Sequence, residues 1–255
     1  MSTTTKIALV TGGSRGLGKD MAINLAKKGI DVILTYVNNK EAADETVKAI
    51  EALGRKAAAL RLDMANIKAI DPFVQELSAT LQSKWNTNAF DCLINNAGIG
   101  GGATIDKVTE EMFDEFLNVH FKGVYFLTQK CLPLINNNGR VINISTGTTR
   151  FTNPGYSVYA SMKGAVEVLT KYMAREFGPR GITVNIVAPG PVATDFNNAT
   201  IRSNPQLQER LGALSPLNRV GEAENDIGPV VAFLCTDEAR WVNGQRIEVS
   251  GGINV

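Results

Sequence analysis

Short runs of apolar residues alternate along the chain with longer segments of helical periodicity, and this alternation limits the possible folds more than any other feature. Most of the runs are apolar at nearly every position, which is typical of strands buried on both faces. Strands separated by helices form βαβ crossovers and therefore a parallel sheet. The predicted strands span 7–10, 32–37, 57–62, 90–95, 141–145, 182–187 and 246–249. The predicted helices span 16–29, 39–53, 66–84, 109–136, 158–177 and 222–235.

This pattern predicts a doubly wound, seven-stranded parallel sheet of the Rossmann type, with helices on both faces, in one domain over residues 1–255. A chain of 255 residues can bury a complete core unaided. One irregular stretch, at about 191–217, mixes apolar anchors with polar residues and is longer than most loops in compact domains. We expect this stretch to be a partly helical substrate lid that closes when cofactor binds.

Charge and cysteine content argue against several classes of function. Lys and Arg total 26 against 25 for Asp and Glu, so no basic footprint for nucleic acid or an anionic membrane is present. No run approaches the roughly 20 apolar residues of a membrane span, and none near the start resembles a signal peptide. Cys92, Cys131 and Cys235 are too scattered for a zinc site or a disulfide framework. We therefore expect a cytoplasmic protein with no metal, nucleic-acid or membrane partner.

A glycine-rich turn follows the first predicted strand and opens the first predicted helix. It reads Thr11-Gly12-Gly13-Ser14-Arg15-Gly16-Leu17-Gly18. Glycine allows a tight turn and close approach of a ligand to the backbone. Free N–H groups at the start of a helix then favour a phosphate. The spacing T-G-x-x-x-G-x-G differs from the G-x-G-x-x-G fingerprint, so the turn alone leaves an ordinary flexible loop as an alternative.

A tyrosine and a lysine lie four residues apart in the predicted helix 158–177. Tyr159 and Lys163 therefore share one face of the helix, one turn apart. Because a nearby ammonium favours the phenolate, we expect Lys163 to lower the pKa of Tyr159 from its ordinary value near 10. A solvent-exposed Tyr–Lys pair would have the same spacing, so this pair alone does not establish a site.

Several polar or glycine-rich segments follow the carboxyl ends of the predicted strands. Ser145 ends the fifth strand, Asn95-Asn96-Ala97-Gly98 follows the fourth, and Pro189-Gly190 follows the sixth. Ligands of open parallel sheets bind beyond the carboxyl ends of the strands. We therefore expect these segments, the glycine-rich turn and the Tyr159–Lys163 pair to face one site.

Together these residues resemble the short-chain dehydrogenase/reductase family over essentially the whole chain, from residue 11 to residue 252. Asp63 after the third strand, Asn118, and P-G-x-V-x-T at 189–194 extend the match. The resemblance implies that Tyr159 exchanges a proton with the substrate oxygen and that Ser145 hydrogen-bonds the same oxygen. It implies that Lys163 holds the nicotinamide ribose and tunes Tyr159, and that Asn118 supports a water leading to Lys163.

The resemblance also implies a dinucleotide, which we expect to be NADP(H). A carboxylate at the end of the second strand would select NAD, but Asp31 lies at the opposite end of that strand and Tyr36 occupies the acid position. Arg15 and Asn38 could instead meet a 2′-phosphate. The residues implied in cofactor binding are Gly12, Ser14, Arg15, Gly16, Leu17, Gly18, Tyr36, Asn38, Asp63, Met64, Asn95, Ala97, Gly98, Tyr159, Lys163, Pro189, Gly190, Val192 and Thr194.

We therefore predict an oxidoreductase that transfers hydride between NADP(H) and a carbonyl or secondary alcohol, similar to 3-oxoacyl-carrier-protein reductases. The alternatives are a non-catalytic dinucleotide sensor, which would typically lose Ser145, Tyr159 or Lys163, and an NAD-preferring relative. His120 is interpreted as a packed or interface residue. The helices at 109–136 and 158–177 are apolar on more than one face, and the resemblance implies that they pair in a homotetramer. The small-molecule substrate cannot be predicted.

Overall fold

The computed structural model describes residues 5–253, which contain one parallel sheet of seven strands in the order β3-β2-β1-β4-β5-β6-β7. The strands are β1 (Ile7–Val10), β2 (Asp31–Tyr36), β3 (Ala57–Arg61), β4 (Phe90–Asn95), β5 (Ile135–Ile144), β6 (Thr183–Pro189) and β7 (Arg246–Val249). The chain reverses its direction of growth between β1 and β4, so the loops after these two strands open a crevice at the carboxyl edge. The doubly wound Rossmann-type sheet is confirmed.

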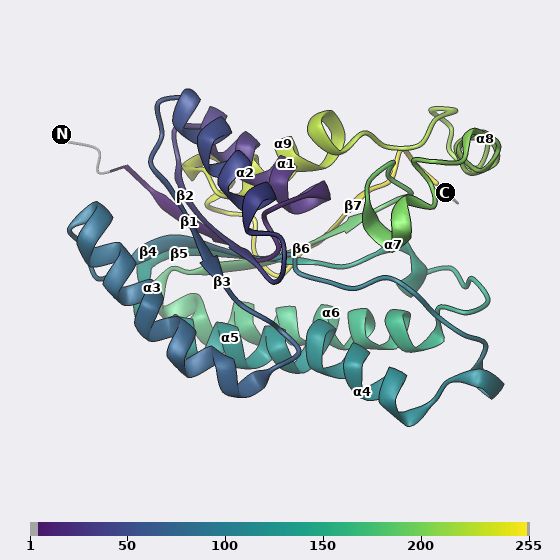
Figure 1. Ribbon diagram of the computed structural model, residues 1–255, viewed down its shortest axis with the longest axis horizontal. Coiled ribbons are helices and arrows are strands. Elements are labelled where there is room, and N and C mark those ends of the chain that lie inside the picture. Colours follow the sequence, from purple (N-terminus) through teal and green to yellow (C-terminus); the bar gives the residue numbers. More distant parts are fainter. Residues whose placement is uncertain (1–4, 254–255) are drawn as a thin grey trace.

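Helices cover both faces of this sheet (Figure 1). One layer consists of α1 (Gly16–Lys27), α2 (Lys40–Ala52) and α9 (Gly228–Leu234). The other consists of α3 (Ile70–Trp85), α4 (Glu110–Leu117), α5 (Gly123–Cys131) and α6 (Ser157–Phe177). Two short helices, α7 (Phe196–Ala199) and α8 (Pro205–Gly212), lie beyond the sheet. Of the helices within residues 5–253, none is long and apolar enough to cross a membrane.

The central strands are largely apolar because they contribute to two cores. In β1, Ala8 and Val10 pack in the core under α1 and α9, whereas Ile7 and Leu9 pack in the core under α3, α5 and α6. Successive strand residues point to opposite faces of the sheet. Since both faces are covered by apolar helices, no strict alternation of apolar and polar residues remains in the sequence.

Two predicted helices have different boundaries in the structure. The helix expected at 109–136 is divided into α4, a π-helical turn (Asn118–Lys122) and α5, and β5 already begins at Ile135. Pro133 lies in the short 3₁₀ turn after α5, where it cannot continue the ladder of an α-helix. The helix expected at 222–235 starts as a π-helical turn (Ala223–Ile227) before α9. The π-helical turn between α4 and α5 carries a residue of the site.

Candidate active site

The glycine-rich turn connects β1 to α1 in a conformation that requires glycine. Gly12 and Gly16 have φ values of +65° and +53°, in the left-handed region that costs other residues energy. A Cβ at position 18 would overlap the carbonyl oxygen of Gly12. The turn therefore exists only with glycine at 18, and its backbone is bare toward the sheet edge.

Hydrogen bonds from two neighbouring strands hold this turn in place. The Thr11 hydroxyl oxygen accepts from the backbone N–H groups of Asn96 (2.9 Å) and Ala97 (3.0 Å). The Asn96 amide donates back to the Thr11 carbonyl at 2.9 Å. From β2, the Thr35 hydroxyl accepts from the N–H of Gly12 at 3.1 Å. Asn96 therefore holds the glycine turn through both its backbone and its side chain.

The start of α1 has donors free for an anion. Arg15 is the residue before the helix, and its side chain makes no capping bond to the helix N-terminus. Arg15 is exposed and has no ion-pair partner among residues 5–253. Helix N-terminal N–H groups together with the helix dipole attract phosphate. The turn and α1 therefore fit a phosphate-bearing ligand, with Arg15 beside it.

The ends of β2 and β6 reach the same edge. Tyr36 ends β2 and Asn38 is exposed just beyond it. Asp31, at the start of β2, accepts hydrogen bonds from the Lys56 backbone and the Trp85 indole, which gives it a structural role away from the edge. β6 ends at Pro189, and the chain continues through Gly190 and Val192 to Thr194. The Thr194 Cβ lies 3.8 Å from the position that a Cβ on Gly16 would occupy.

Three predicted cofactor contacts have a different place in the structure. The Asn95 side chain is 3% exposed and donates to Thr128 (3.0 Å) and Asn143 (2.8 Å), within the core. Met64 is also buried in the core. An Asp63 carboxylate oxygen caps the N–H of Ala65 at 2.9 Å. The Asn95 and Met64 side chains thus lie in the core, and Ala97 and Gly98 are what this segment brings to the edge.

The helix α6 carries Tyr159 and Lys163 on one face, as predicted. The Lys163 ammonium lies 5.8 Å from the centre of the Tyr159 ring and donates to the Ile144 carbonyl at 2.8 Å. Lys163 is 4% exposed. Burial lowers its pKa to about 8, because removal from water disfavours the charged form.

The pKa of Tyr159 is shifted in the opposite direction from our expectation. Burial raises it above 10 and outweighs the hydrogen bond with Thr146, which lowers it. The phenol of Tyr159 is therefore protonated at neutral pH, the state required of a proton donor.

The hydroxyl beside Tyr159 belongs to Thr146, not to Ser145. The Thr146 side chain lowers the pKa of the Tyr159 phenol, whereas the Ser145 hydroxyl donates to Glu167 of α6 at 2.6 Å. Both residues are in extended backbone that continues β5, so their side chains point in opposite directions. The structure thus brings Thr146, the residue after the predicted Ser145, to the side of Tyr159. Ser145 shares its strand face with Asn143, which bonds Thr170 of α6, and this alternation was the available signal.

Glu167 is the centre of a separate polar network under the 146–149 loop. It accepts from the Thr149 hydroxyl (2.8 Å) and from the Arg246 guanidinium (2.9 Å) as well as from Ser145. Burial raises the pKa of Glu167, but these hydrogen bonds outweigh it and hold the pKa below its ordinary value. Residues 5–253 contain no group of three or more His, Cys, Asp or Glu arranged for a metal. The network holds the loop that carries Thr146.

The segment between α4 and α5 brings His120 to the site instead of Asn118. His120 is fully buried, and its ring centre lies 5.1 Å from that of Tyr159. Asn118 is half-buried and makes no side-chain hydrogen bond within the described residues. Residues two apart on a helix point about 200° apart, so the two side chains cannot share a face. His120 follows the buried spacing of Phe116, Val124 and Leu127, which was the missed signal.

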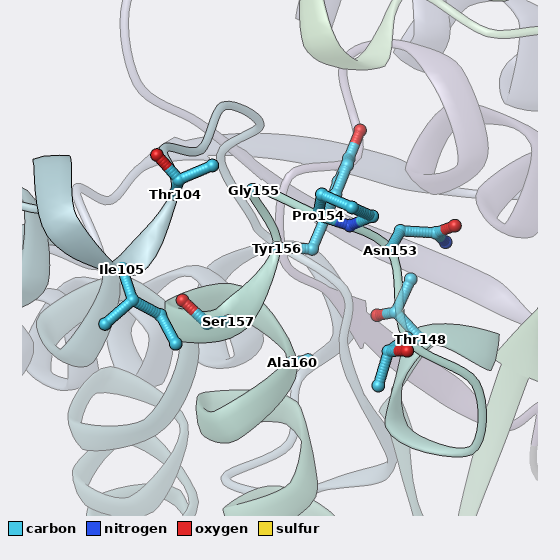
Figure 2. A pocket seen from close by; sticks show the side chains of 10 residues that line it. Thr104, Ile105, Thr148, Asn153, Pro154, Gly155, Tyr156, Ser157 and Ala160 are labelled. Atoms are coloured by element: carbon cyan, nitrogen blue, oxygen red, sulfur yellow. The ribbon is translucent and has the colours of Figure 1, made fainter.

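A pocket of about 390 Å³ adjoins this group of residues. Figure 2 shows Thr104 and Ile105 on one side of it and Thr148 and Asn153 on the other. The first turn of α6 contributes Ala160 between them. Tyr156, which also lines the pocket, lies 6.2 Å from Tyr159 between ring centres. The pocket is large enough for part of a small organic molecule.

Comparison with known proteins identifies relatives along the whole chain. A family model described as enoyl-(acyl carrier protein) reductase matches residues 12–254. The 3-oxoacyl-[acyl-carrier-protein] reductase FabG of Staphylococcus aureus strain Mu50 is 37% identical over 251 residues, which cover 98% of each chain.

Two ketoreductases are similar in structure. The promiscuous reductase LugOII, which catalyses keto-reduction at C1 during lugdunomycin biosynthesis, has a TM-score of 0.93 and 38% identity, with 100% of both chains covered. The angucycline C-6 ketoreductase LanV with bound NADP has a TM-score of 0.92 and 36% identity, covering 98% of this chain and 96% of its own. A second LanV structure, with NADP and rabelomycin, has a TM-score of 0.89 and 35% identity over the same shares of the two chains.

Proposed function

Because the chain belongs to the short-chain dehydrogenase/reductase family, we propose that it reduces a ketone to a secondary alcohol with NADPH, using Tyr159 as the proton donor. The observation that carries this proposal is the juxtaposition at one sheet edge of a protonated, half-buried phenol, an ammonium and a glycine turn. A non-catalytic dinucleotide sensor would not need the phenol and the ammonium together.

The residues at the sheet edge fit NADP(H), which LanV also binds. The backbone at Gly12 to Gly18 and the start of α1 would hold the pyrophosphate, and Thr194 lies beside this turn. Arg15 is exposed and unpaired within the described residues, while Tyr36 stands where an NAD-selecting acid would be. When bound, NADPH supplies the hydride. A 2′-phosphate would gain a charge-assisted contact from Arg15, typically worth about 1.5–3 kcal/mol.

Tyr159 and Thr146 would act together on the carbonyl oxygen. As the carbon gains hydride, the oxygen gains negative charge, and the Tyr159 phenol donates its proton to form the alcohol. The Thr146 hydroxyl, whose side chain lowers the pKa of the phenol, would donate to the same oxygen and stabilise the developing charge. Tyr159 then regains one proton from solvent. Lys163, charged below pH of about 8, stabilises the transient phenolate.

Aromatic rings around Tyr159 favour a planar, ring-containing ketone as the substrate. Phe116, Tyr156 and Phe196 have ring centres 6.4, 6.2 and 6.3 Å from that of Tyr159. Phe196 is 44% exposed, so part of this surface remains open to a ligand. The similarity to LugOII and LanV points in the same direction. A 3-oxoacyl thioester, suggested by the similarity to FabG, is the second candidate.

A substrate screen tests the proposed function. NADPH oxidation is followed spectrophotometrically with polycyclic aromatic ketones, 3-oxoacyl thioesters, simple ketones and quinones, and the alcohol product is identified by mass spectrometry. We expect the highest kcat/KM with a fused-ring ketone and a lower rate with NADH. Binding of NADPH without reduction of any carbonyl compound would contradict the proposal and support the sensor.

We propose that residues 191–217 act as a lid of the single domain. They include α7 and α8, so this stretch is partly helical. Phe196 lies against Tyr159, and Asn197 approaches Gly100 closely enough that a Cβ there would be 2.7 Å from the Asn197 Cβ. Asn197, Asn198 and Ala199 all have positive φ, a strained run from which a change of conformation would release energy.

We also propose a homotetramer. The outer face of α5 and α6 leaves three apolar side chains exposed, namely Tyr125 (41%), Val168 (54%) and Tyr172 (64%). A second copy of the same helix pair would cover them through a two-fold axis. Light scattering at micromolar concentration should give four times the chain mass of 27.4 kDa, and a monomer would refute the proposal.

For localisation we propose the cytoplasm. Cys92, Cys131 and Cys235 are buried free thiols, which a reducing compartment preserves. Fractionation of cells that express the native chain should recover the protein with cytoplasmic markers.

A further inference from the structure

His120 lies inside the Tyr159 cluster, which we define as Tyr159, Lys163, Thr146, His120 and Phe116. The His120 ring is fully buried and stands edge-on to the Tyr159 ring, with 5.1 Å between centres and an interplanar angle of 88°. Its centre lies 5.4 Å from that of Phe116. The residue belongs to the π-helical turn between α4 and α5. Such turns interrupt helices frequently at functional sites.

One nitrogen of this ring has partners and the other has none. Nε2 lies 3.0 Å from the Ile99 carbonyl oxygen and 3.3 Å from the Ile99 backbone nitrogen. Nδ1 is buried and has no hydrogen-bond partner among the described residues. In the tautomer that uses the shorter contact, Nε2–H donates to the Ile99 carbonyl and Nδ1 is a bare acceptor. A buried acceptor without a partner costs energy unless a ligand or water supplies the hydrogen bond.

The charges around the ring keep it neutral. Burial and the nearby Lys163 ammonium lower the pKa of His120 to about 2, against a smaller opposing contribution from Ile99. The titratable groups that face the ring are Tyr159 and Lys163 of α6. The Lys163 ammonium has three N–H donors, and one of them donates to the Ile144 carbonyl. Another can therefore donate to an oxygen near His120. An oxygen that accepts from Lys163 and donates to Nδ1 would satisfy both groups.

Gly98 leaves only a thin cover over the Nδ1 edge of the ring. A Cβ at position 98 would lie 2.9 Å from the His120 Cε1 and 3.4 Å from Nδ1. Gly98 is exposed and belongs to the loop after β4, at the carboxyl edge of the sheet. Nδ1 therefore faces the edge at which we place the dinucleotide.

We infer that His120 is a positioning residue whose Nδ1 accepts a hydrogen bond from a hydroxyl group, either a water or a hydroxyl of the bound dinucleotide, and holds that hydroxyl beside Lys163. The inference rests on the proposed function for its role in turnover. In each reduction Tyr159 gives one proton to the substrate oxygen and takes one back from solvent. His120 gains and loses no proton in this cycle; it orients the O–H through which the proton returns.

Two variants of His120 separate Nδ1 from Nε2. Asn carries its polar atoms on Cγ, where Nδ1 is attached, so His120→Asn keeps a group near Nδ1 and loses the bond to Ile99. Gln carries them one carbon further out, so His120→Gln keeps a group near Nε2 and loses Nδ1. Lys122→Ala, an exposed change on the same π-helical turn, is the control for expression and folding.

We expect His120→Asn to retain kcat within about threefold of the wild type. We expect His120→Gln to lose at least roughly tenfold, a part of the 10²–10⁴-fold that positioned proton transfer supplies. The solvent isotope effect on kcat should rise in His120→Gln, because proton return becomes slower, and stay unchanged in His120→Asn. Equal activities in the two variants, or a more active Gln variant, would overturn the inference and leave His120 as a tether for Ile99.

A direct measurement does not depend on turnover. His120 is the only histidine of the chain, so the ¹⁵N signals of its ring are assigned without ambiguity in protein made without a histidine tag. We expect a neutral Nε2–H tautomer that does not titrate between pH 5 and 9. If the ¹⁵N chemical shift of Nδ1 is typical of an accepted hydrogen bond already in the free protein, the hydroxyl group belongs to a water. If that chemical shift appears only with NADP⁺, the hydroxyl group belongs to the dinucleotide. A free Nδ1 in both states would overturn the inference even if the enzyme reduces ketones.

Discussion

The glycine turn at residues 11–18 and the Tyr159 cluster lie at the same edge of the sheet, but they are held in different ways. The turn is backbone: two left-handed glycines, a glycine that tolerates no Cβ, and hydrogen bonds from Thr11 to the loop after β4. The cluster consists of buried and half-buried side chains from separate elements, namely α4, the π-helical turn, the segment after β5 and α6. We infer that the turn determines affinity for the cofactor and that the cluster determines the rate.

This difference predicts which kinetic constant each substitution changes. Damage to the turn should weaken NADPH binding and leave kcat at saturating NADPH unchanged. Removal of the Tyr159 or Thr146 hydroxyl from the cluster should lower kcat and leave NADPH binding near its original strength. The following predictions test this division, beginning with the largest expected effect.

The neighbouring hydroxyls of Thr146 and Ser145 give the first test. Removal of a donor to a developing oxyanion typically costs about 10²–10³-fold in rate, so Thr146→Val should lower kcat by that amount. Ser145→Ala removes a bond to Glu167 and should cost less than about tenfold. Steady-state kinetics on the best ketone from the screen decides between them. If the Ser145 variant proves the slower one, our assignment of the hydroxyl is wrong.

Gly18→Ala should have the next largest effect and act on binding. The new Cβ overlaps the Gly12 carbonyl, so the turn must move and lose charge-assisted contacts worth roughly 1.5–3 kcal/mol each. We expect NADPH affinity to fall about a hundredfold in a fluorescence titration. Gly164→Ala, where a Cβ meets nothing within 4 Å, is the control and should stabilise α6 by about 0.5–1 kcal/mol. Unchanged affinity in the Gly18 variant would show that the turn does not hold the cofactor.

Arg15→Ala should remove the preference for NADPH without a comparable effect on NADH. A charge-assisted contact worth about 1.5–3 kcal/mol corresponds to a tenfold to hundredfold preference. The ratio of the dissociation constants for NADPH and NADH, measured by titration in both proteins, tests this. Wild-type protein that binds NADH as tightly as NADPH would contradict the assignment of the cofactor.

Alkaline pH should affect the cluster through Lys163. Because burial lowers the pKa of Lys163 to about 8, the ammonium is charged below that pH and loses its proton above it. We expect kcat/KM, which reports the free enzyme, to fall about tenfold per pH unit above pH 8. The fall in kcat should occur at higher pH, because a bound anion favours the charged ammonium. A profile that stays flat up to pH 10 would mean that the ammonium is not needed.

The smallest effect is expected in the lid. Amide hydrogen exchange of residues 191–217 should slow when NADPH saturates the protein, because Phe196 then closes on the site. Peptides from β5, which is central in the sheet, serve as the internal reference and should not change. Equal exchange of 191–217 in both states would show that this segment is not coupled to the cofactor.

The sequence predicted the backbone half of the site better than the side-chain half, and the reason is physical. Glycine spacing in 12–18 reports local backbone geometry directly, and the apolar runs identify the buried strands. Ser145 and Asn95 were assigned by their motifs, but the Ser145 hydroxyl bonds Glu167 and the Asn95 amide bonds groups in the core. The direction of a side chain in the site depends on the register of its strand or on the π-helical turn. Neither feature can be recognised from a sequence motif.

Burial also decided features that the sequence could not supply. The rise in the pKa of Tyr159 depends on how completely α6 and its neighbours exclude water from the phenol. The start of β5 at Ile135 depends on its pairing with Phe90 of β4. His120 followed the buried spacing of its helix, but its contact with Tyr159 depends on the packing of that helix against α6.

The central claim, that Tyr159 donates the proton to the substrate oxygen, is tested most directly by Tyr159→Phe. The dissociation constant for NADPH and the kcat for one ketone are measured in the variant and the wild type. We predict a dissociation constant within about threefold of the wild type and a kcat lower by at least about 10²-fold, as expected for loss of general acid catalysis. A variant that turns over at the wild-type rate, or that is slow only because it no longer binds NADPH, would contradict the account.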